Sequence, residues 1–165
     1  MILVALGANL AGPAGDPQAQ VLAALAALAG EGIRVRQRSR LWRSPSWPDP
    51  RAPAFVNAVA RVETALDPAG LLAALHRIEG RLGRVRGPAN APRAIDLDLL
   101  DHDAIVRAAP PPVLPHPRLA SRAFVLRPLA EVAPAWRHPV DGRSVGQLIA
   151  ALPPGAVAEA IESEA

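Results

Sequence analysis

The stretch RAIDLDLLDHDAIV, residues 93–106, decides how the chain is interpreted. Aliphatic side chains alternate here with Asp96 and Asp98, which is the period-two pattern of a β-strand. In such a strand both carboxylates project from one face, about 6–7 Å apart, and the aliphatic side chains from the other. Like charges at that spacing repel each other unless a cation lies between them. The pattern therefore predicts a strand and raises the question of which cation it holds.

Hydrophobic periodicity and capping residues place the other elements around this strand. Asp16 and Asp67 each supply an N-cap before a proline at the first helical position. Gly30 and Gly83 are expected to end the two helices. The expected elements, in chain order, are a strand over 2–6, a helix over 17–28, strands over 33–42 and 55–64, a helix over 68–82, and the aspartate strand.

That order, β-α-β-β-α-β, is typical of a ferredoxin-like core. We therefore predict an α+β fold with two layers, formed by one domain over residues 1–165, with C-terminal helical additions that include a short helix near 144–152. The stretch SPSWPDPRAP, residues 44–53, holds four prolines and is expected to be an irregular loop. The acidic tail, residues 155–165, is expected to be flexible.

The composition is that of a folded domain without thiol chemistry. The chain has 165 residues, of which 50% are hydrophobic, enough for one domain with a core. It contains no run of about 18 apolar residues that would indicate a membrane span, and its start, MILVALGANL, is typical of a buried strand rather than a signal peptide. The absence of cysteine excludes disulfides, thiolate metal sites and cysteine nucleophiles, and it fits a cytoplasmic protein.

All 18 basic residues are arginines. The absence of lysine excludes a P-loop lysine and Schiff-base chemistry. The pI is about 11.1 although the formal net charge is only +3, because guanidinium groups barely titrate. The charge of the whole chain therefore does not indicate a nucleic-acid partner, whereas a local cluster of arginines can still bind phosphate.

The aspartate pair is a candidate site for Mg²⁺, which takes one or two carboxylates together with phosphate oxygens and water. Arg84, Arg86 and Arg93 precede the pair and form a candidate phosphate-binding loop. Two simpler interpretations stay open. The aspartates could line the solvated face of an edge strand, and Arg84 and Arg86 could only complement the C-terminus of the preceding helix.

Two further candidates lie outside the aspartate strand. His116 stands between two prolines, which hold it in a rigid loop, and Arg122 follows six residues later. A lone histidine is commonly structural, so both interpretations of His116 stay open. Phe55 and Asn57 share one strand face, where an aromatic ring beside an amide could either pack in the core or bind a flat heterocycle.

The segment APRAIDLDLL, residues 91–100, resembles the signature GPRxxDLDIL of the 6-hydroxymethyl-7,8-dihydropterin pyrophosphokinases of folate biosynthesis. The resemblance covers nearly the whole chain through ALGANL (5–10), SPSW (44–47), FVNAV (55–59), RIEGRLGRVR (77–86) and LPHPRLASRAFVLRPL (114–129). It implies a ferredoxin-like core and an enzyme that uses two Mg²⁺ ions. Such an enzyme moves the β,γ-diphosphate of ATP onto the pterin hydroxymethyl group and releases AMP.

Carried over by position, the resemblance implies that Asp96 and Asp98 hold both magnesium ions and act in catalysis together with Arg84 and Arg93. The triphosphate would be contacted by Arg84, Arg86, Arg93 and Arg122, with His116 on the attacked phosphate or its leaving oxygen. The nucleotide side would be lined by Leu72, His76, Glu79, Leu99 and Val113.

On the pterin side, the resemblance implies that Phe55 and Phe124 sandwich the ring. The ring edge would be hydrogen-bonded by Asn57 and by the backbone around Ser44, Pro45 and Trp47. Three positions depart from the family pattern: Ala8 replaces a serine, His76 replaces a glutamine, and Asn90-Ala91 replaces Trp-Gly before the signature. The last change removes an aromatic lid residue, whose part Trp47 could take.

The expected partners are small molecules, ATP and the pterin, with no nucleic acid and no membrane, and the enzyme is expected to be a monomer. Asp101 and Asp103 fall beyond the matched signature and are expected to be ordinary turn residues. Two alternatives remain: a non-catalytic pterin- or nucleotide-binding relative, and an RNA-binding ferredoxin-like domain. The second requires aromatic residues exposed on the central strands, and the chain has only two Phe and three Trp.

Overall fold

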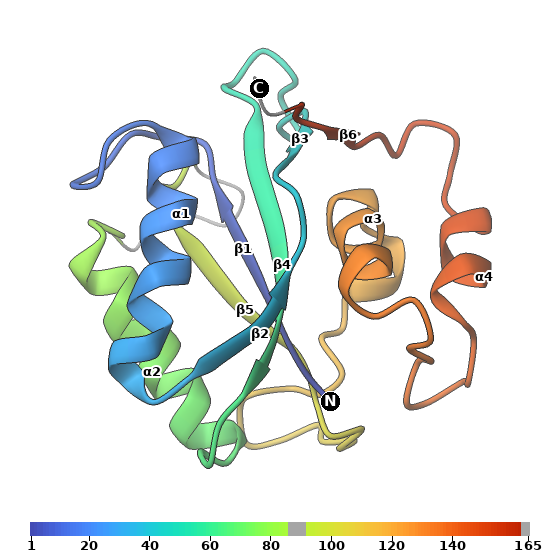
Figure 1. The fold of residues 1–165 in the computed structure, drawn as a ribbon. Coiled ribbons are helices and arrows are strands. Elements are labelled where there is room, and N and C mark those ends of the chain that lie inside the picture. Colours follow the sequence, from blue (N-terminus) through green and yellow to red (C-terminus); the bar gives the residue numbers. More distant parts are fainter. Residues whose placement is uncertain (86–91, 163–165) are drawn as a thin grey trace.

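Strand β1 (Ile2–Ala8) is the centre of the fold in the computed structural model, which describes residues 1–85 and 92–162. It pairs in antiparallel fashion with β4 (Phe55–Glu63) on one side and with β5 (Asp96–His102) on the other. Six of its seven residues are buried. Because helices cover both faces of the sheet (Figure 1), the strand is apolar throughout rather than alternating.

The remaining strands extend the sheet beyond β4. The order is β5-β1-β4-β3-β6, with β3 at Trp42–Ser44 and β6 at Glu159–Ala160, while β2 (Arg34–Arg38) pairs with another part of β4. The predicted ferredoxin-like α+β core is confirmed. The strand predicted over 33–42 is divided at Ser39, because its hydroxyl accepts the Val59 N–H at 3.0 Å in place of a backbone carbonyl.

Both predicted helices of the core form, as α1 (Pro17–Ala27) and α2 (Pro68–Arg81). Their N-caps are the predicted aspartates: Asp16 accepts the Ala19 N–H and Asp67 accepts the Gly70 N–H, both at 2.8 Å. Helix α2 is followed by Gly83 in a positive-φ conformation, as predicted. For the first helix the prediction was wrong, because a 3₁₀ turn, η1 (Leu28–Glu31), continues the chain and the left-handed residue is Gly32 rather than Gly30.

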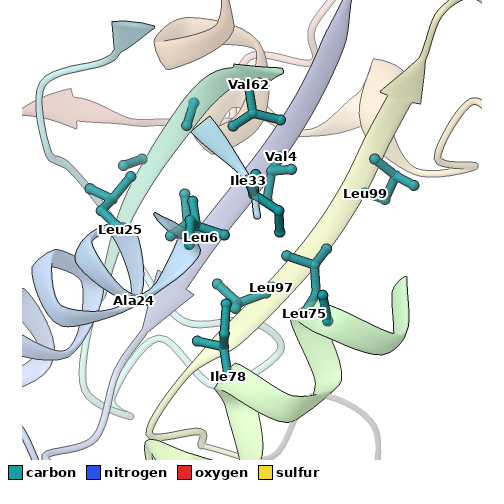
Figure 2. Close-up of a cluster of buried hydrophobic side chains, with 14 of the residues drawn as sticks. Val4, Leu6, Ala24, Leu25, Ile33, Val62, Leu75, Ile78, Leu97 and Leu99 are labelled. Atoms are coloured by element: carbon teal, nitrogen blue, oxygen red, sulfur yellow. The ribbon is translucent and has the colours of Figure 1, made fainter. Parts of the chain in front are cut away.

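Helices α1 and α2 pack against one face of the sheet and form the larger core. Figure 2 shows Val4 and Leu6 of β1 between Leu25 of α1 and Leu75 and Ile78 of α2. The side chains of Leu97 and Leu99 of β5 enter the same core. Each such buried aliphatic side chain contributes about 1.5–3 kcal/mol of hydrophobic stabilisation, so this half of the alternating pattern in β5 supports the fold.

The opposite face is covered by α3 (Ala123–Val132), with a 3₁₀ turn, η2 (Leu119–Ser121), before it and α4 (Val145–Ala150) outside it (Figure 1). Leu3, Val59 and Leu100 of the sheet pack there against Leu126 and Leu129 of α3. The short helix predicted near 144–152 is α4, which begins with a capping box formed by Ser144 and Gln147. Among the described residues, none of the helices is both long and apolar enough to span a membrane.

The acidic tail was predicted to be flexible, but part of it joins the sheet. Glu159 and Ala160 form β6 and pair with Arg43 and Trp42 of β3. The next residue, Ile161, donates its N–H to Leu41 O at 2.8 Å and packs against the larger core. Residues 163–165 lie outside the part of the chain that is described.

The prediction that Asp101 is an ordinary turn residue was wrong. Asp101 belongs to β5 and is only 3% exposed. Its carboxylate accepts the Trp136 indole N–H at 2.7 Å and the Ala104 N–H at 2.9 Å. The cause is a register shift between Leu3 and Val4 of β1, which leaves Leu100 unpaired as a β-bulge and interrupts the alternation of faces. Asp103 lies in a turn with φ +52°, as predicted.

The bond between Trp136 and Asp101 makes a stability prediction. Trp136→Phe removes the indole donor and leaves a buried carboxylate oxygen without it, which should lower the free energy of unfolding by about 1–3 kcal/mol in urea denaturation. Trp47→Phe is the control: that indole is 72% exposed, so the change should stay within about 0.5 kcal/mol. Equal, small effects of the two substitutions would contradict a structural role for Asp101.

Candidate active site

The pairing registers bring the predicted site residues onto one row of the sheet. Gly7 of β1 is paired with Asn57 of β4 on one side and with Asp96 of β5 on the other. Trp42 of β3 is paired with the far side of Asn57. Since neighbouring strands lie about 4.8 Å apart, Asn57 and Asp96 are separated by about 10 Å across Gly7.

The site residues also share a face. Leu3 of β1 and Val59 of β4 belong to the α3 core, so side chains an even number of residues away in the same regular strand point to the same side. Phe55 and Asn57 therefore face α3, as do Asp96 and Asp98, because Leu97 and Leu99 occupy the opposite core. Gly7 keeps this row open: a Cβ there would lie 3.1 Å from Asn57 Oδ1 and 3.8 Å from the Phe55 ring.

Asp96 is held by two arginines. Arg84 donates to its Oδ1 at 2.6 Å and Arg93 donates to its Oδ2 at 3.0 Å. Arg84 is itself bound by Glu79, a 4%-exposed carboxylate that also accepts the Leu97 N–H at 2.9 Å. Burial raises the pKa of Glu79, while the Leu97 N–H and Arg84 oppose this shift. Glu79 thus holds both Arg84 and the backbone of β5 at Leu97 in place, and it is not a free carboxylate at the surface.

Asp98 has no comparable partner among the described residues. Burial, followed by repulsion from Asp96, raises its pKa to about 7. The positive charge of Arg122 opposes this shift, and burial in turn lowers the pKa of Arg122. An aspartate with such a pKa is a carboxylate for which an added cation would be strongly favourable.

His116 lies beside Asp98 without forming an ion pair. Its Nε2 is 3.9 Å from Asp98 Oδ1, and burial, with Arg122 second, lowers its pKa to about 4. The ring is therefore neutral near pH 7. Its Nδ1 accepts the Arg118 N–H at 3.2 Å, which assigns the proton to Nε2 and aims an N–H donor into the site.

The donor set fits Mg²⁺ bound together with a phosphate ligand. Within residues 1–85 and 92–162 there is no group of three or more His, Cys, Asp or Glu that could hold a metal ion by itself. Two aspartates on one strand face, flanked by arginines, match an ion that takes only one or two carboxylates and completes its shell with phosphate oxygens and water.

The aromatic and amide groups lie on the other side of Gly7. Asn57 is buried, and its Nδ2 donates to Ser44 Oγ at 2.9 Å, while no described residue donates to its Oδ1. Phe55 is half-buried at the start of β4. Phe124, in the first turn of α3, is also half-buried, and the Arg122 guanidinium lies 5.3 Å from its ring centroid.

Not every predicted residue joins this face. The side chain of Leu99 is buried in the opposite core, so only its backbone could meet a ligand. Leu72 and His76 lie on α2, half-buried and exposed respectively, and Val113 is exposed in the loop after β5. Pro45 and Trp47 are exposed in the 44–53 loop. Arg86 lies outside the described residues.

Two residues that the sequence did not single out also belong to this region. Gly7 separates the two halves of the site, and the buried Asn9 lies just beyond the end of β1. Both stand in the segment ALGANL, 5–10, where a glycine and an amide interrupt an otherwise apolar strand end. That interruption, in a segment that also carries the family resemblance, is the signal in the sequence that could have identified them.

Comparison with known proteins gives the same assignment over most of the chain. Residues 3–134 match the family described as 7,8-dihydro-6-hydroxymethylpterin-pyrophosphokinase. The chain is 40% identical over 153 residues to the 2-amino-4-hydroxy-6-hydroxymethyldihydropteridine pyrophosphokinase of Methylorubrum extorquens, covering 92% of this chain and 93% of that protein. The corresponding protein of Pseudomonas aeruginosa is 42% identical over 157 residues, with 92% and 91% covered.

A longer relative contains the same unit. The folic acid synthesis protein fol1 of Pneumocystis carinii is 37% identical over 144 residues, which are 87% of this chain. The chain spans 19% of that protein's length. The similarity therefore concerns one part of a larger polypeptide in that organism.

The raised pKa of Asp98 predicts how stability depends on pH without divalent metal. Between the unfolded value of 3.8 and about 7, the folded wild type holds a proton that the unfolded chain releases. Its free energy of unfolding should thus fall over this window relative to Asp98→Asn, whose amide cannot ionise. Because 33% of the side chain is exposed, screening limits the effect to about 1–2 kcal/mol.

Urea denaturation with EDTA at pH 4.5, 6 and 8 measures this difference. Asp98→Asn should gain on the wild type as the pH rises and reach a constant advantage above pH 7. A difference that is the same at all three pH values would contradict the account of Asp98.

Proposed function

The chain belongs to the 7,8-dihydro-6-hydroxymethylpterin-pyrophosphokinase family, and on this premise we propose that the sheet face beneath α3 is its active site. The enzyme is an ATP-dependent pyrophosphokinase of folate biosynthesis. It transfers the β,γ-diphosphate of ATP to the hydroxymethyl group of 6-hydroxymethyl-7,8-dihydropterin and releases AMP. The observation that carries the assignment of the site is the row that places Asn57 and Asp96 on either side of Gly7.

In this proposal Asp96 and Asp98 hold two Mg²⁺ ions together with the triphosphate. When bound, Mg²⁺ neutralises phosphate charge and lowers the pKa of the pterin hydroxyl. The chain's own contribution is a fixed pair of carboxylates: Arg84 and Arg93 orient Asp96 by one bond to each oxygen. The desolvated Asp98 favours binding of a cation, because binding relieves its repulsion from Asp96.

The arginines hold the substrate's negative charge. Each guanidinium has five N–H donors, so Arg84 and Arg93 can bind phosphate oxygens with donors not used on Asp96. Arg122, between Asp98 and Phe124, supplies a third positive charge, and Arg86 is proposed as a fourth from its sequence position. They stabilise charge on the transferring diphosphate and on departing AMP. Neutral His116 donates its Nε2–H to a phosphate oxygen without adding charge.

We propose that the pterin ring stacks between Phe55 and Phe124. Asn57 Oδ1 is available to accept an N–H of the ring edge, because no described residue donates to it, while the bond from Nδ2 to Ser44 fixes the amide. Backbone groups around Ser44, Pro45 and Trp47 complete the edge. Trp47 is exposed and next to this loop's prolines, so it can cover the ring in place of the tryptophan that the family often has before the signature.

The nucleotide base and ribose are assigned to the edge beside β5 and α2. Leu72, His76 and Val113 are the proposed lining, together with the backbone at Leu99. Glu79 acts from beneath by holding Arg84. We further propose that the enzyme acts as a monomer in the cytoplasm without a nucleic-acid partner, since one chain supplies both halves of the site and contains no cysteine.

The deciding experiment is incubation with ATP, Mg²⁺ and 6-hydroxymethyl-7,8-dihydropterin, followed by separation of the nucleotides. Formation of AMP supports diphosphate transfer. Formation of ADP would instead indicate ordinary phosphoryl transfer, and tight binding without turnover would favour a non-catalytic relative. Salt-dependent RNA binding without AMP would favour the RNA-binding alternative.

The carboxylates make a sharper prediction. Asp96→Ala and Asp98→Ala should remain folded but lose at least about 100-fold in kcat, because each removes a preorganised charge at the reacting phosphates. Asp141→Ala is the matched control: this exposed aspartate interacts with Arg143 and with His138 at 3.7 Å, in the turn before α4, so the rate should stay within about twofold. Near wild-type rates for either active-site variant would contradict the two-metal assignment.

A further inference from the structure

Asn9 bonds to both halves of the site at once. It lies directly after β1 and is 3% exposed. Its Nδ2 donates to Ser46 Oγ at 3.2 Å and to Pro53 O at 3.1 Å, in the loop proposed to cover the pterin. Its Oδ1 accepts the Arg93 N–H at 2.7 Å, on the phosphate side.

On the phosphate side, both backbone polar groups of Arg93 are hydrogen-bonded to the turn after β1. Besides the N–H bound by the Asn9 side chain, the Arg93 carbonyl accepts the backbone N–H groups of Asn9 at 3.0 Å and Leu10 at 3.1 Å. The backbone of Arg93 is therefore fixed to the turn after β1. The Arg93 guanidinium in turn donates to the Asp96 carboxylate at 3.0 Å. The position of one hydrogen-bond donor to Asp96 therefore depends on Asn9.

On the pterin side, Asn9 draws together the two ends of a loop. Ser46 Oγ donates to Pro53 O at 2.5 Å, and both groups also bond to the Asn9 amide. The residues between them are mostly exposed, and Trp47 is 72% exposed. The buried hydrogen bonds that hold the two ends of the 44–53 loop are therefore made to the Asn9 amide, which also holds Arg93.

A second buried amide shows that this connection is specific. Gln20 is fully buried, accepts the Ala14 N–H at 2.9 Å, and donates to Leu82 O at 2.7 Å and Ala94 O at 2.9 Å. Those contacts lie on the phosphate side alone. The Gln20 amide makes three hydrogen bonds, as the Asn9 amide does, but none of them is to the 44–53 loop.

We propose that Asn9 is a positioning residue that couples the two substrate sites. Through one amide, the placement of Arg93 by bound Mg²⁺·ATP and the closure of the 44–53 loop over the pterin favour each other. The inference rests on the proposed function, because that function assigns Arg93 to phosphate and the loop to the pterin. Such coupling between sites commonly amounts to a factor of about 5–150 in affinity.

The test measures pterin affinity with and without bound nucleotide. The probes are 6-hydroxymethyl-7,8-dihydropterin and α,β-methylene-ATP with Mg²⁺, because the methylene group replaces the oxygen at which the reaction breaks the bond. In the wild type the nucleotide should lower the pterin Kd at least about fivefold. In Asn9→Ala this ratio should fall to within about twofold of one, whereas Gln20→Ala should keep the wild-type ratio.

Melting temperatures of all variants accompany the titrations. If Asn9→Ala lowers the melting temperature but keeps the ratio, Asn9 is only structural and the proposal is overturned. Asn9→Asp covers the case in which Asn9→Ala does not fold: it keeps an acceptor for the Arg93 N–H but has no donor for Pro53 O. Its ratio should also approach one, and a wild-type ratio would overturn the proposal.

The titration does not depend on turnover. Absence of AMP formation by the wild type would therefore count against the proposed function, while the ratio alone decides the role of Asn9. A wild type without any nucleotide effect on pterin affinity would overturn the coupling directly.

Discussion

The antiparallel pairing of β1 with β4 on one edge and β5 on the other is the constraint on which the rest of the molecule depends. It places Asn57 and Asp96 on the same row, with only Gly7 between them. Two chemically different surfaces, one for a flat heterocycle and one for phosphate and metal, thereby share one rigid sheet. A reaction between two bound substrates needs such fixed placement, since misplacement by an ångström costs rate.

The electrostatics of the site follow from what lies under and beside β5. Glu79 and Asp96 hold Arg84 between them, so negative and positive charges alternate from the buried core to the surface. Asp98 stands outside this balance, and burial, followed by repulsion from Asp96, raises its pKa to about 7. The repulsion anticipated from the alternating pattern is therefore concentrated on one of the two carboxylates. The other is already neutralised by Arg84 and Arg93.

Local signals in the sequence predicted much of this structure correctly. The capped helix starts at Asp16 and Asp67, and the shared face of Asp96 and Asp98, depend on neighbouring residues, so periodicity and capping rules recover them. The elements that escaped prediction depend on distant partners. Leu100 bulges because of the register with β1, Ser39 replaces a backbone acceptor for Val59, and the tail pairs with β3.

The same distinction holds within the site. The residue types of the aspartates, arginines and aromatic side chains indicate their chemistry, and the resemblance to the pterin pyrophosphokinases assigns them roles. The role of Asn9 is not indicated by its residue type, because its partners Ser46, Pro53 and Arg93 are 37, 44 and 84 residues away in sequence. Only the folded chain brings them together. Leu99 is the converse case: its position in the signature suggested a binding role, whereas its side chain is buried in the larger core.

The central claim is that Asp96 and Asp98 form a metal site that is completed by nucleotide. Electron paramagnetic resonance of Mn²⁺, as a substitute for Mg²⁺, counts the ions bound per chain with and without α,β-methylene-ATP. The account predicts two bound ions in the presence of the nucleotide, weaker and incomplete binding in its absence, and loss of binding in Asp96→Asn and Asp98→Asn. Two ions bound equally well to these variants, or no ion bound with the nucleotide, would contradict it.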